Sequence, residues 1–184
     1  TTSRKIKDMI LEAGAAEVSS LLSPLKEAHE SGRLGDDEFI AQGMARIGFQ
    51  GTRAEFAAAW GDIFRENAPM TTLIDKLAGR HPLYLFSNTS RLHRDWLFEK
   101  FPVFARFDGG VYSYEAGVSK PHEPIYREAV ARFGLDPSET LYIDDLAENI
   151  AMGGRLRFAT HLYSANEHDK LEQRVERWLG GGLR

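Results

Sequence analysis

The sequence contains no cysteine, and this absence excludes several kinds of chemistry. Disulfide bonds, zinc sites with thiolate ligands and a cysteine nucleophile are all ruled out. A chain without cysteine fits a reducing cytoplasm, which is the location we expect. Long apolar runs are also lacking, since none approaches the roughly 18 residues of a membrane-spanning helix. No charged and apolar leader marks a secretion signal.

The chain lacks an excess of positive charge. It carries 23 lysine and arginine residues against 27 aspartate and glutamate residues, for a net charge of -4. A general nucleic-acid-binding protein usually has a basic stripe, and anionic membranes attract basic surfaces. We therefore expect neither nucleic acid nor a membrane among the partners. The 42% of hydrophobic residues are enough for a sizeable core in one domain, or in one domain with an insert.

The first part of the chain has helical periodicity throughout. Apolar residues recur at helical spacing from Ile6 to Ala13, and Gly14 follows as a stop. Three further helix starts are indicated by proline, by acidic residues and by a capping box, at Ser23-Pro24, Asp36-Asp37 and Thr52 with Glu55. No strand pattern stands out here. We therefore predict a helical domain over residues 1–70.

From residue 71 onward, short apolar runs alternate with helical patterns. Such runs fit strands buried on both faces of a parallel sheet. The four runs that we predict as strands are 83–86, 110–114, 141–143 and 158–163. Strands that alternate with helices imply right-handed crossovers and a doubly wound parallel sheet. We therefore predict an α/β domain over residues 71–184.

Polar residues follow two of these strands directly, and ligands of open α/β sheets bind at the carboxyl ends of strands. Ser87-Asn88 follows the first strand, Asp144-Asp145 follows the third, and Lys120 lies in the loop before a helix. Two adjacent carboxylates repel each other unless a cation is present, and oxygen ligands favour a hard ion such as Mg²⁺. The lysine and the hydrogen-bond donors suit a phosphate.

Each pattern also has a purely structural interpretation. The serines at 87–90 and the two aspartates can cap the helices that follow them, and a lysine before a proline is typically a solvated surface residue. Taken singly, these interpretations are the more common. The order of the three clusters and their positions after strands together favour a phosphate and magnesium site.

In these clusters the chain resembles the haloacid dehalogenase superfamily, in its phosphatase-like branch with a helical cap. The motifs that carry the resemblance are Leu85-Phe86-Ser87-Asn88-Thr89, Ser119-Lys120-Pro121 and Tyr142-Ile143-Asp144-Asp145. The similarity runs from about residue 83 to 163. It implies a Rossmann-like core with residues 1–70 as an N-terminal cap over the active site.

The resemblance implies roles for single residues. Ser87 and Lys120 would be catalytic and would bind the phosphate together with Asn88. Asp145 would ligate Mg²⁺ directly, and Asp144 would be a second ligand or would act through water. Paired aspartates point to phosphoryl transfer, because the metal-free dehalogenases of the superfamily do not keep them. For the following residues, 148 and 149, support of this loop and a plain position on a helix surface both stay open.

The family's first motif, Asp-x-Asp after an N-terminal strand, does not occur in the sequence. Asp8 lies in a helical pattern, and Asp36-Asp37 lies at a helix start in the predicted cap. In the family this strand is central, between the strands that end at Ser87 and Asp145. Three hypotheses stay open: the 184 residues are a fragment of a protein whose first ~15–25 residues, not included here, contain the strand, which we favour; another copy or a partner donates one; or the two neighbouring strands pair directly.

Two functions follow. We expect a magnesium-dependent phosphatase of a small phosphorylated metabolite, which in the intact protein works through an aspartyl-phosphate. The alternative is a non-catalytic protein that binds phosphate and Mg²⁺, or an interaction protein, without the nucleophile. Whether the chain forms a homodimer or takes a strand from a partner stays open, as does the identity of the substrate.

Overall fold

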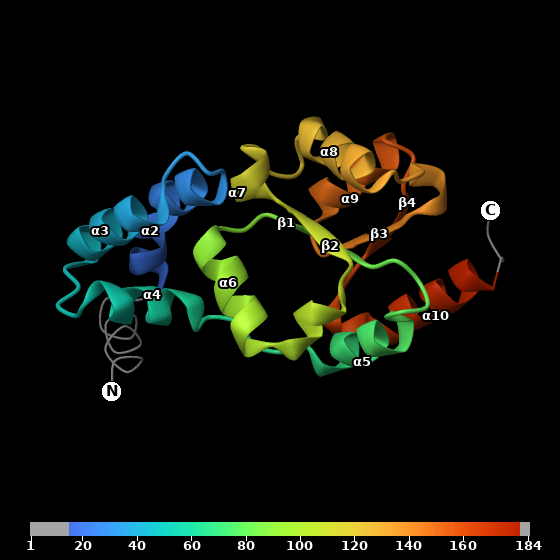
Figure 1. Ribbon diagram of the computed structural model, residues 1–184, viewed down its shortest axis with the longest axis horizontal. Helices are drawn as coiled ribbons and strands as arrows, with labels where there is room; N and C mark the ends of the chain where they lie inside the picture. The colour runs from blue at the N-terminus through green and yellow to red at the C-terminus, as the bar shows by residue number, and fades with distance from the viewer. Residues whose placement is uncertain (1–14, 181–184) are drawn as a thin grey trace. The chain divides into compact units, whose positions relative to one another are not determined.

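The computed structural model describes residues 15–180, and the helix predicted at residues 6–13 lies outside this range (Figure 1). The helices are α2 (Ala15–Glu30), α3 (Asp36–Ile47), α4 (Arg53–Gly61), α5 (Ala68–Leu77), α6 (Arg91–Lys100), α7 (Ser113–Ala116), α8 (Glu123–Phe133), α9 (Ala147–Arg155) and α10 (His168–Leu179). The strands are β1 (Tyr84–Ser87), β2 (Gly109–Tyr112), β3 (Leu141–Asp144) and β4 (Ala159–Leu162). Short 3₁₀ turns are at Pro102–Arg106, Pro137–Glu139 and Ala165–Glu167.

The chain forms two compact units. Of the described residues, unit 1 takes in 15–65, Ser87–Ala105 and Tyr112–Ser119, and unit 2 takes in Glu66–Phe86, Arg106–Val111 and 120–180. The chain passes between the units several times, so that β1 and β2 each have their last residue in unit 1. The predicted division into a cap over 1–70 and a core over 71–184 says which residues cover the active site and which form it. That division stays a prediction.

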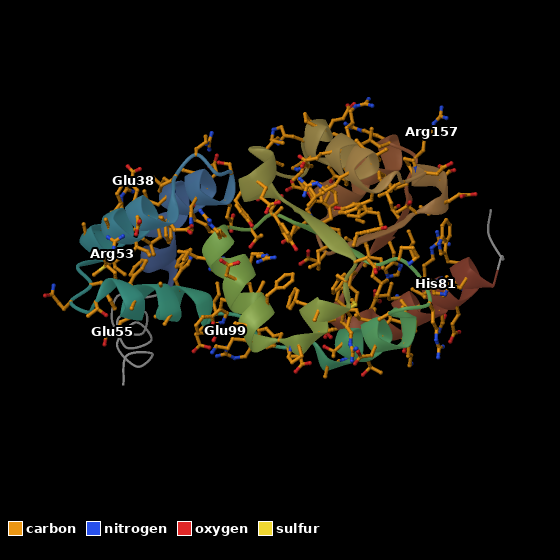
Figure 2. The ribbon with its side chains drawn as sticks, in the orientation of Figure 1. Glu38, Arg53, Glu55, His81, Glu99 and Arg157 are labelled. Atoms are coloured by element: carbon orange, nitrogen blue, oxygen red, sulfur yellow. The ribbon has the colours of Figure 1, made fainter. Side chains whose placement is uncertain are left out.

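Unit 1 is helical, as the sequence predicts. The apolar faces of α2, α3 and α4 form its core, with these buried side chains: Leu22, Leu25, Leu34, Phe39, Ile40, Phe49 and Phe56. The predicted capping box begins α4: the Thr52 amide donates to Glu55 Oε2 at 2.7 Å, and the Glu55 amide donates to Thr52 Oγ1 at 3.2 Å. Figure 2 shows Arg53 and Glu55 on this first turn.

Two local predictions in unit 1 are wrong. Pro24 does not open a helix but lies inside α2. Proline in a helix interior costs about 3 kcal/mol, and burial of the neighbouring Leu22 and Leu25 offsets this cost. The strand predicted over 110–114 ends at Tyr112, and Ser113 begins α7. The hydroxyl of Ser113 is fully buried and donates to the Glu30 carbonyl at 2.5 Å, so a tertiary contact overrides the strand pattern.

Unit 2 contains strands flanked by helices, and the predicted α/β class is confirmed. β3 pairs with β4 in parallel, from Leu141 opposite Ala159 to Asp144 opposite Leu162, and β1 pairs with β2. Within residues 15–180 these are two separate two-stranded sheets, so the hypothesis that β1 and β3 pair directly is wrong. Two hypotheses for the central strand stay predictions: its position in a segment upstream of these 184 residues, and its donation by another copy or a partner.

The strands are less buried than predicted. All four residues of β1 are half-buried, and in the described part of the chain β1 pairs with one strand, β2. β3 alternates instead, with Tyr142 and Asp144 buried. Helices α5 and α10 supply the buried Leu73, Leu171 and Val175, against which Leu141 and Ile143 of β3 pack. Side-chain alternation along β3 therefore directs Tyr142 and Asp144 to the same face.

Helix α9 approaches β3 closely through a glycine. A Cβ atom added at Gly153 would lie 2.6 Å from the Tyr142 ring, whereas one at Gly154 would meet nothing within 4 Å. The absence of a side chain at Gly153 therefore lets α9 pack directly on the Tyr142 ring. The turn to β4 contains Arg157 at a φ of 70° (Figure 2). No helix in residues 15–180 has the length and apolar character that crossing a membrane requires.

Candidate active site

Lys120 and Asp144 form a buried ion pair in unit 2. Lys120 precedes α8, and Asp144 is the last residue of β3. The Lys120 Nζ lies 2.6 Å from Asp144 Oδ2, and the two side chains are 6% and 5% exposed. The same ammonium donates to the carbonyl of Phe86 in β1 at 2.6 Å. Lys120 is therefore not a solvated surface lysine.

The Asp144 carboxylate accepts four hydrogen bonds. Oδ2 accepts from Lys120 Nζ and from the hydroxyl of Tyr142 at 2.7 Å. Oδ1 accepts from the amide of Leu146 at 2.9 Å and from Asn149 Nδ2 at 2.9 Å. The contact with Leu146 closes a turn at the end of β3, and the contact with Asn149 connects that turn to α9. Both oxygens are thus held by groups from several elements.

Burial and charge act against each other in this cluster. Burial alone would raise the pKa of Asp144, but the hydrogen bonds and charge of Lys120 outweigh it and hold that pKa below its usual value. Burial lowers the pKa of Lys120, and the hydrogen bond and charge of Asp144 offset only part of this effect. Burial, followed by the hydrogen bond to the carboxylate, raises the pKa of Tyr142. The phenol therefore stays a donor at neutral pH.

Aromatic rings surround the ion pair. Phe86 and Tyr142 have ring centroids 5.7 Å apart, and Tyr126 meets both rings edge to face. Lys120 Nζ lies 4.8 Å from the Phe86 ring centroid, at cation–π distance. Tyr126 also donates to the backbone carbonyl of Asn149 at 3.0 Å. These walls exclude water, and electrostatic interactions are stronger in such a low-dielectric setting.

Asp145 differs sharply from its neighbour. It is exposed, and its charge acts on Lys120 in the direction that favours the protonated ammonium. Residues 15–180 contain no cluster of three or more histidine, aspartate or glutamate residues arranged to hold a metal. Magnesium does not need one, because it usually takes one or two carboxylates, several waters and a substrate phosphate. A solvent-facing carboxylate next to a buried ammonium fits that requirement.

The other predicted site residues, Ser87 and Asn88, are half-buried and lie in unit 1. The helix that follows them is capped by Ser90, whose hydroxyl accepts from the His93 amide at 3.3 Å. Ser87 is therefore not the cap of α6. The amide of Thr89 donates to Ser113 Oγ at 2.9 Å. A role of Ser87 and Asn88 in phosphate binding stays a prediction.

Two residues of the cluster are missed or left open by sequence reasoning. Asn149, which is 2% exposed, supports the Asp144 turn, whereas Glu148 is exposed on the helix surface. The sequence pattern places Tyr142 only in a buried strand. Its position two residues before Asp144, on the same face of β3, is the signal that could have identified it.

Comparison with known proteins agrees with this architecture. The sequence profile of the haloacid dehalogenase-like hydrolases matches residues 11–156. A D-ribitol-5-phosphate phosphatase from Bacteroides thetaiotaomicron is 32% identical over 138 residues, covering 71% of this chain and 67% of the relative.

Solved structures are similar too. A predicted HAD-like family hydrolase from Porphyromonas gingivalis has a TM-score of 0.76 and 30% identity, over 92% of this chain and 88% of that one. A HAD family enzyme from Bacteroides thetaiotaomicron, in complex with magnesium and inorganic phosphate, has a TM-score of 0.69 and 28% identity, over 76% and 74% of the two chains.

Fold and site together define an α/β protein with a buried lysine–aspartate pair at the end of a strand. The length of the profile match identifies the family more closely: this chain belongs to the haloacid dehalogenase-like hydrolases.

Proposed function

We propose that this chain contains the phosphate- and magnesium-binding residues of a phosphoric monoester hydrolase that acts on a small phosphorylated metabolite. The observation that carries this proposal is the buried pair of Lys120 and Asp144, with the exposed Asp145 directly after it. An ammonium and a solvent-facing carboxylate at one strand end suit a phosphate and a divalent cation. The phosphatase relative and the magnesium- and phosphate-bound structure support the same chemistry.

Each residue has a part in this proposal. Asp145 would hold the ion, and a bound Mg²⁺ would neutralise phosphate charge and orient the transferring group. Lys120 would donate to a phosphate oxygen and stabilise the charge that spreads over the phosphoryl group. Ser87 and Asn88 would donate a hydroxyl and an amide hydrogen bond to the same group. The helical region would cover the substrate and exclude water.

The nucleophilic aspartate of such a hydrolase is not among these residues. The 184 residues contain no Asp-x-Asp, so attack on phosphorus and the aspartyl-phosphate belong, in this proposal, to the intact protein. The absence of that motif also motivates a second function: a protein that binds phosphate and Mg²⁺ without hydrolysis.

An assay of two proteins separates the functions. One is this chain, and the other is a version extended by the encoded upstream sequence, both tested with Mg²⁺ on a panel that includes D-ribitol 5-phosphate. We expect the extended protein to hydrolyse at least one substrate and Asp145→Asn to remove the activity. Glu148→Gln, a neighbouring exposed acid, is the matched control and should keep it. If an extended protein that carries Asp-x-Asp hydrolyses nothing on this panel, the phosphatase function is wrong.

A further inference from the structure

The two adjacent aspartates occupy very different surroundings. A carboxylate offers about four lone-pair sites, and Asp144 uses four, two on each oxygen. Its side chain is 5% exposed. A cation could reach it only by displacing a donor that is itself buried. Asp145 is exposed to solvent and faces no such restriction.

From this contrast we infer that Asp144 is a positioning residue for the Lys120 ammonium rather than a ligand of the cation, and that Tyr142 and Asn149 hold it in that role. The inference rests on the proposed function, because it assigns the parts of the same site. It makes Asp145 the carboxylate of this pair that binds Mg²⁺.

Of the two supporting residues, Tyr142 bonds to the same carboxylate oxygen as the Lys120 ammonium. Its hydroxyl and Lys120 Nζ share Asp144 Oδ2, at 2.7 and 2.6 Å. The ring is 7% exposed and is fixed by Tyr126, by Phe158 and by the close approach of Gly153. With the phenol in place, Oδ2 has one remaining direction in which to hold the lysine. Removing the hydroxyl leaves Oδ2 with one donor, Lys120, while Leu146 and Asn149 still hold Oδ1, so the ammonium is less well placed.

Asn149 fixes the other oxygen. Its amide nitrogen donates to Asp144 Oδ1, and its backbone carbonyl accepts from the hydroxyl of Tyr126. Because Oδ1 also accepts from Leu146, the turn that presents Asp145 is tied to the same carboxylate. Asp144 thus holds Lys120 and the turn, whereas Asp145 is exposed to solvent.

The test measures magnesium and phosphate binding separately. Calorimetry on the purified chain gives the Kd of Mg²⁺ alone and that of inorganic phosphate at saturating Mg²⁺. For Tyr142→Phe we expect the Mg²⁺ Kd to stay within about threefold, and phosphate to bind roughly tenfold more weakly, as for one lost hydrogen bond in a charged network. Tyr84→Phe, which removes a hydroxyl from β1, is the control and should change neither.

The aspartates provide the second comparison. Asp145→Asn should weaken Mg²⁺ binding at least about tenfold more than Asp144→Asn does, since it removes a charged ligand. Equal losses of Mg²⁺ affinity in the two variants would overturn the inference. So would a change of Mg²⁺ affinity in Tyr142→Phe as large as that in Asp145→Asn.

A measurement without ligands tests the positioning role of Asp144 separately from the proposed function. If neither the wild-type chain nor the version extended by the encoded upstream sequence binds Mg²⁺ or phosphate, the proposed function fails. The positioning role is then decided by urea unfolding of Tyr142→Phe, Lys120→Met and the double variant. A double variant that loses clearly less than the sum of the two single losses supports a shared carboxylate. Additive losses overturn the positioning role.

Discussion

The two units bury ionisable side chains in opposite ways. In unit 2, Lys120 and Asp144 are buried as a charged pair among aromatic rings. In unit 1, His29 stacks on Phe39 at 4.2 Å and His93 stacks on Trp60 at 5.2 Å, and burial lowers the pKa of both histidines. In similar apolar surroundings, the buried side chains are thus charged in unit 2, whereas the buried histidines of unit 1 favour the neutral form.

The partners explain the difference. Asp144 has four donors, one of them charged, which together outweigh the cost of burial. His93 has only the backbone carbonyl of Trp60, at 3.1 Å, and burial lowers its pKa to about 4. His29 bonds to the Asp36 carboxylate at 2.8 Å, yet burial still dominates its pKa. A buried charge needs several partners, and a buried histidine avoids that need by staying neutral.

The largest expected effect is the loss of the lysine. Lys120→Met leaves Asp144 buried without its counter-charge, which should lower the free energy of unfolding by about 3–5 kcal/mol. Lys120→Met with Asp144→Leu should recover much of this loss, because no unpaired charge remains. Urea unfolding followed by circular dichroism measures both.

The control for this prediction is an exposed ion pair. Arg53 bonds to Asp37, whose side chain is 99% exposed, so Arg53→Met should cost less than about 1 kcal/mol. If Lys120→Met costs no more than Arg53→Met, burial of the pair has no energetic consequence and the comparison between the units fails.

The next effect depends on pH. The unfolded chain protonates histidine near 6.5, whereas folded His93 has a pKa of about 4, so the unfolded state binds more protons between these values. Stability should therefore be fully present above pH 6.5 and fall by about 3 kcal/mol as the pH drops to 4. His93→Gln, which keeps a donor toward Trp60, should flatten this slope. The exposed His81→Gln is the control, and an unchanged slope in His93→Gln would contradict the prediction.

A neutral buried group should have a smaller effect. Ser113→Ala leaves the Glu30 carbonyl and the Thr89 amide without their buried partner, at a cost of about 1–3 kcal/mol. Thermal and urea unfolding are the measurements, with the exposed Ser138→Ala as the matched control. Equal stability of the two variants would show that the hydroxyl is not needed in unit 1.

The smallest expected loss of stability comes from removing a helix cap at the surface. Thr52→Ala removes the capping box of α4 and should cost about 1 kcal/mol. Thr72→Ala, at an exposed position within α5, should be close to neutral. A loss above that of Ser113→Ala would mean that a surface cap matters more than a buried hydrogen bond, and would reverse the expected order.

Local sequence signals predicted most of the elements well. The capping box at Thr52 and the acidic start at Asp36 both occur as expected. These features depend on contacts between residues a few positions apart, so the residue types at those positions are enough to predict them. Predictions failed where a distant group intervened, as with Pro24 within a helix held by its buried neighbours and Ser113 held by the Glu30 carbonyl.

The candidate site divides in the same way. The order of the motifs was enough to single out Lys120, Asp144 and Asp145, because each follows or precedes a recognisable element. The family resemblance implied a direct metal contact for Asp145, left Asp144 open between a second ligand and a contact through water, and left Asn149 open between two roles. Strand alternation places Tyr142 on the same face of β3 as Asp144, but the hydrogen bond between the two side chains also depends on how β3 and α9 pack.

Residue types and their spacing along the chain therefore determined the helices, the strands and the kind of chemistry, because periodicity and strand-end polarity are local properties. Tertiary structure decided that one aspartate is enclosed by four donors while the next meets water. It also decided that a lysine remote in sequence is the counter-charge. Burial and hydrogen-bond partners arise only when distant segments pack together, and the chain order does not contain them.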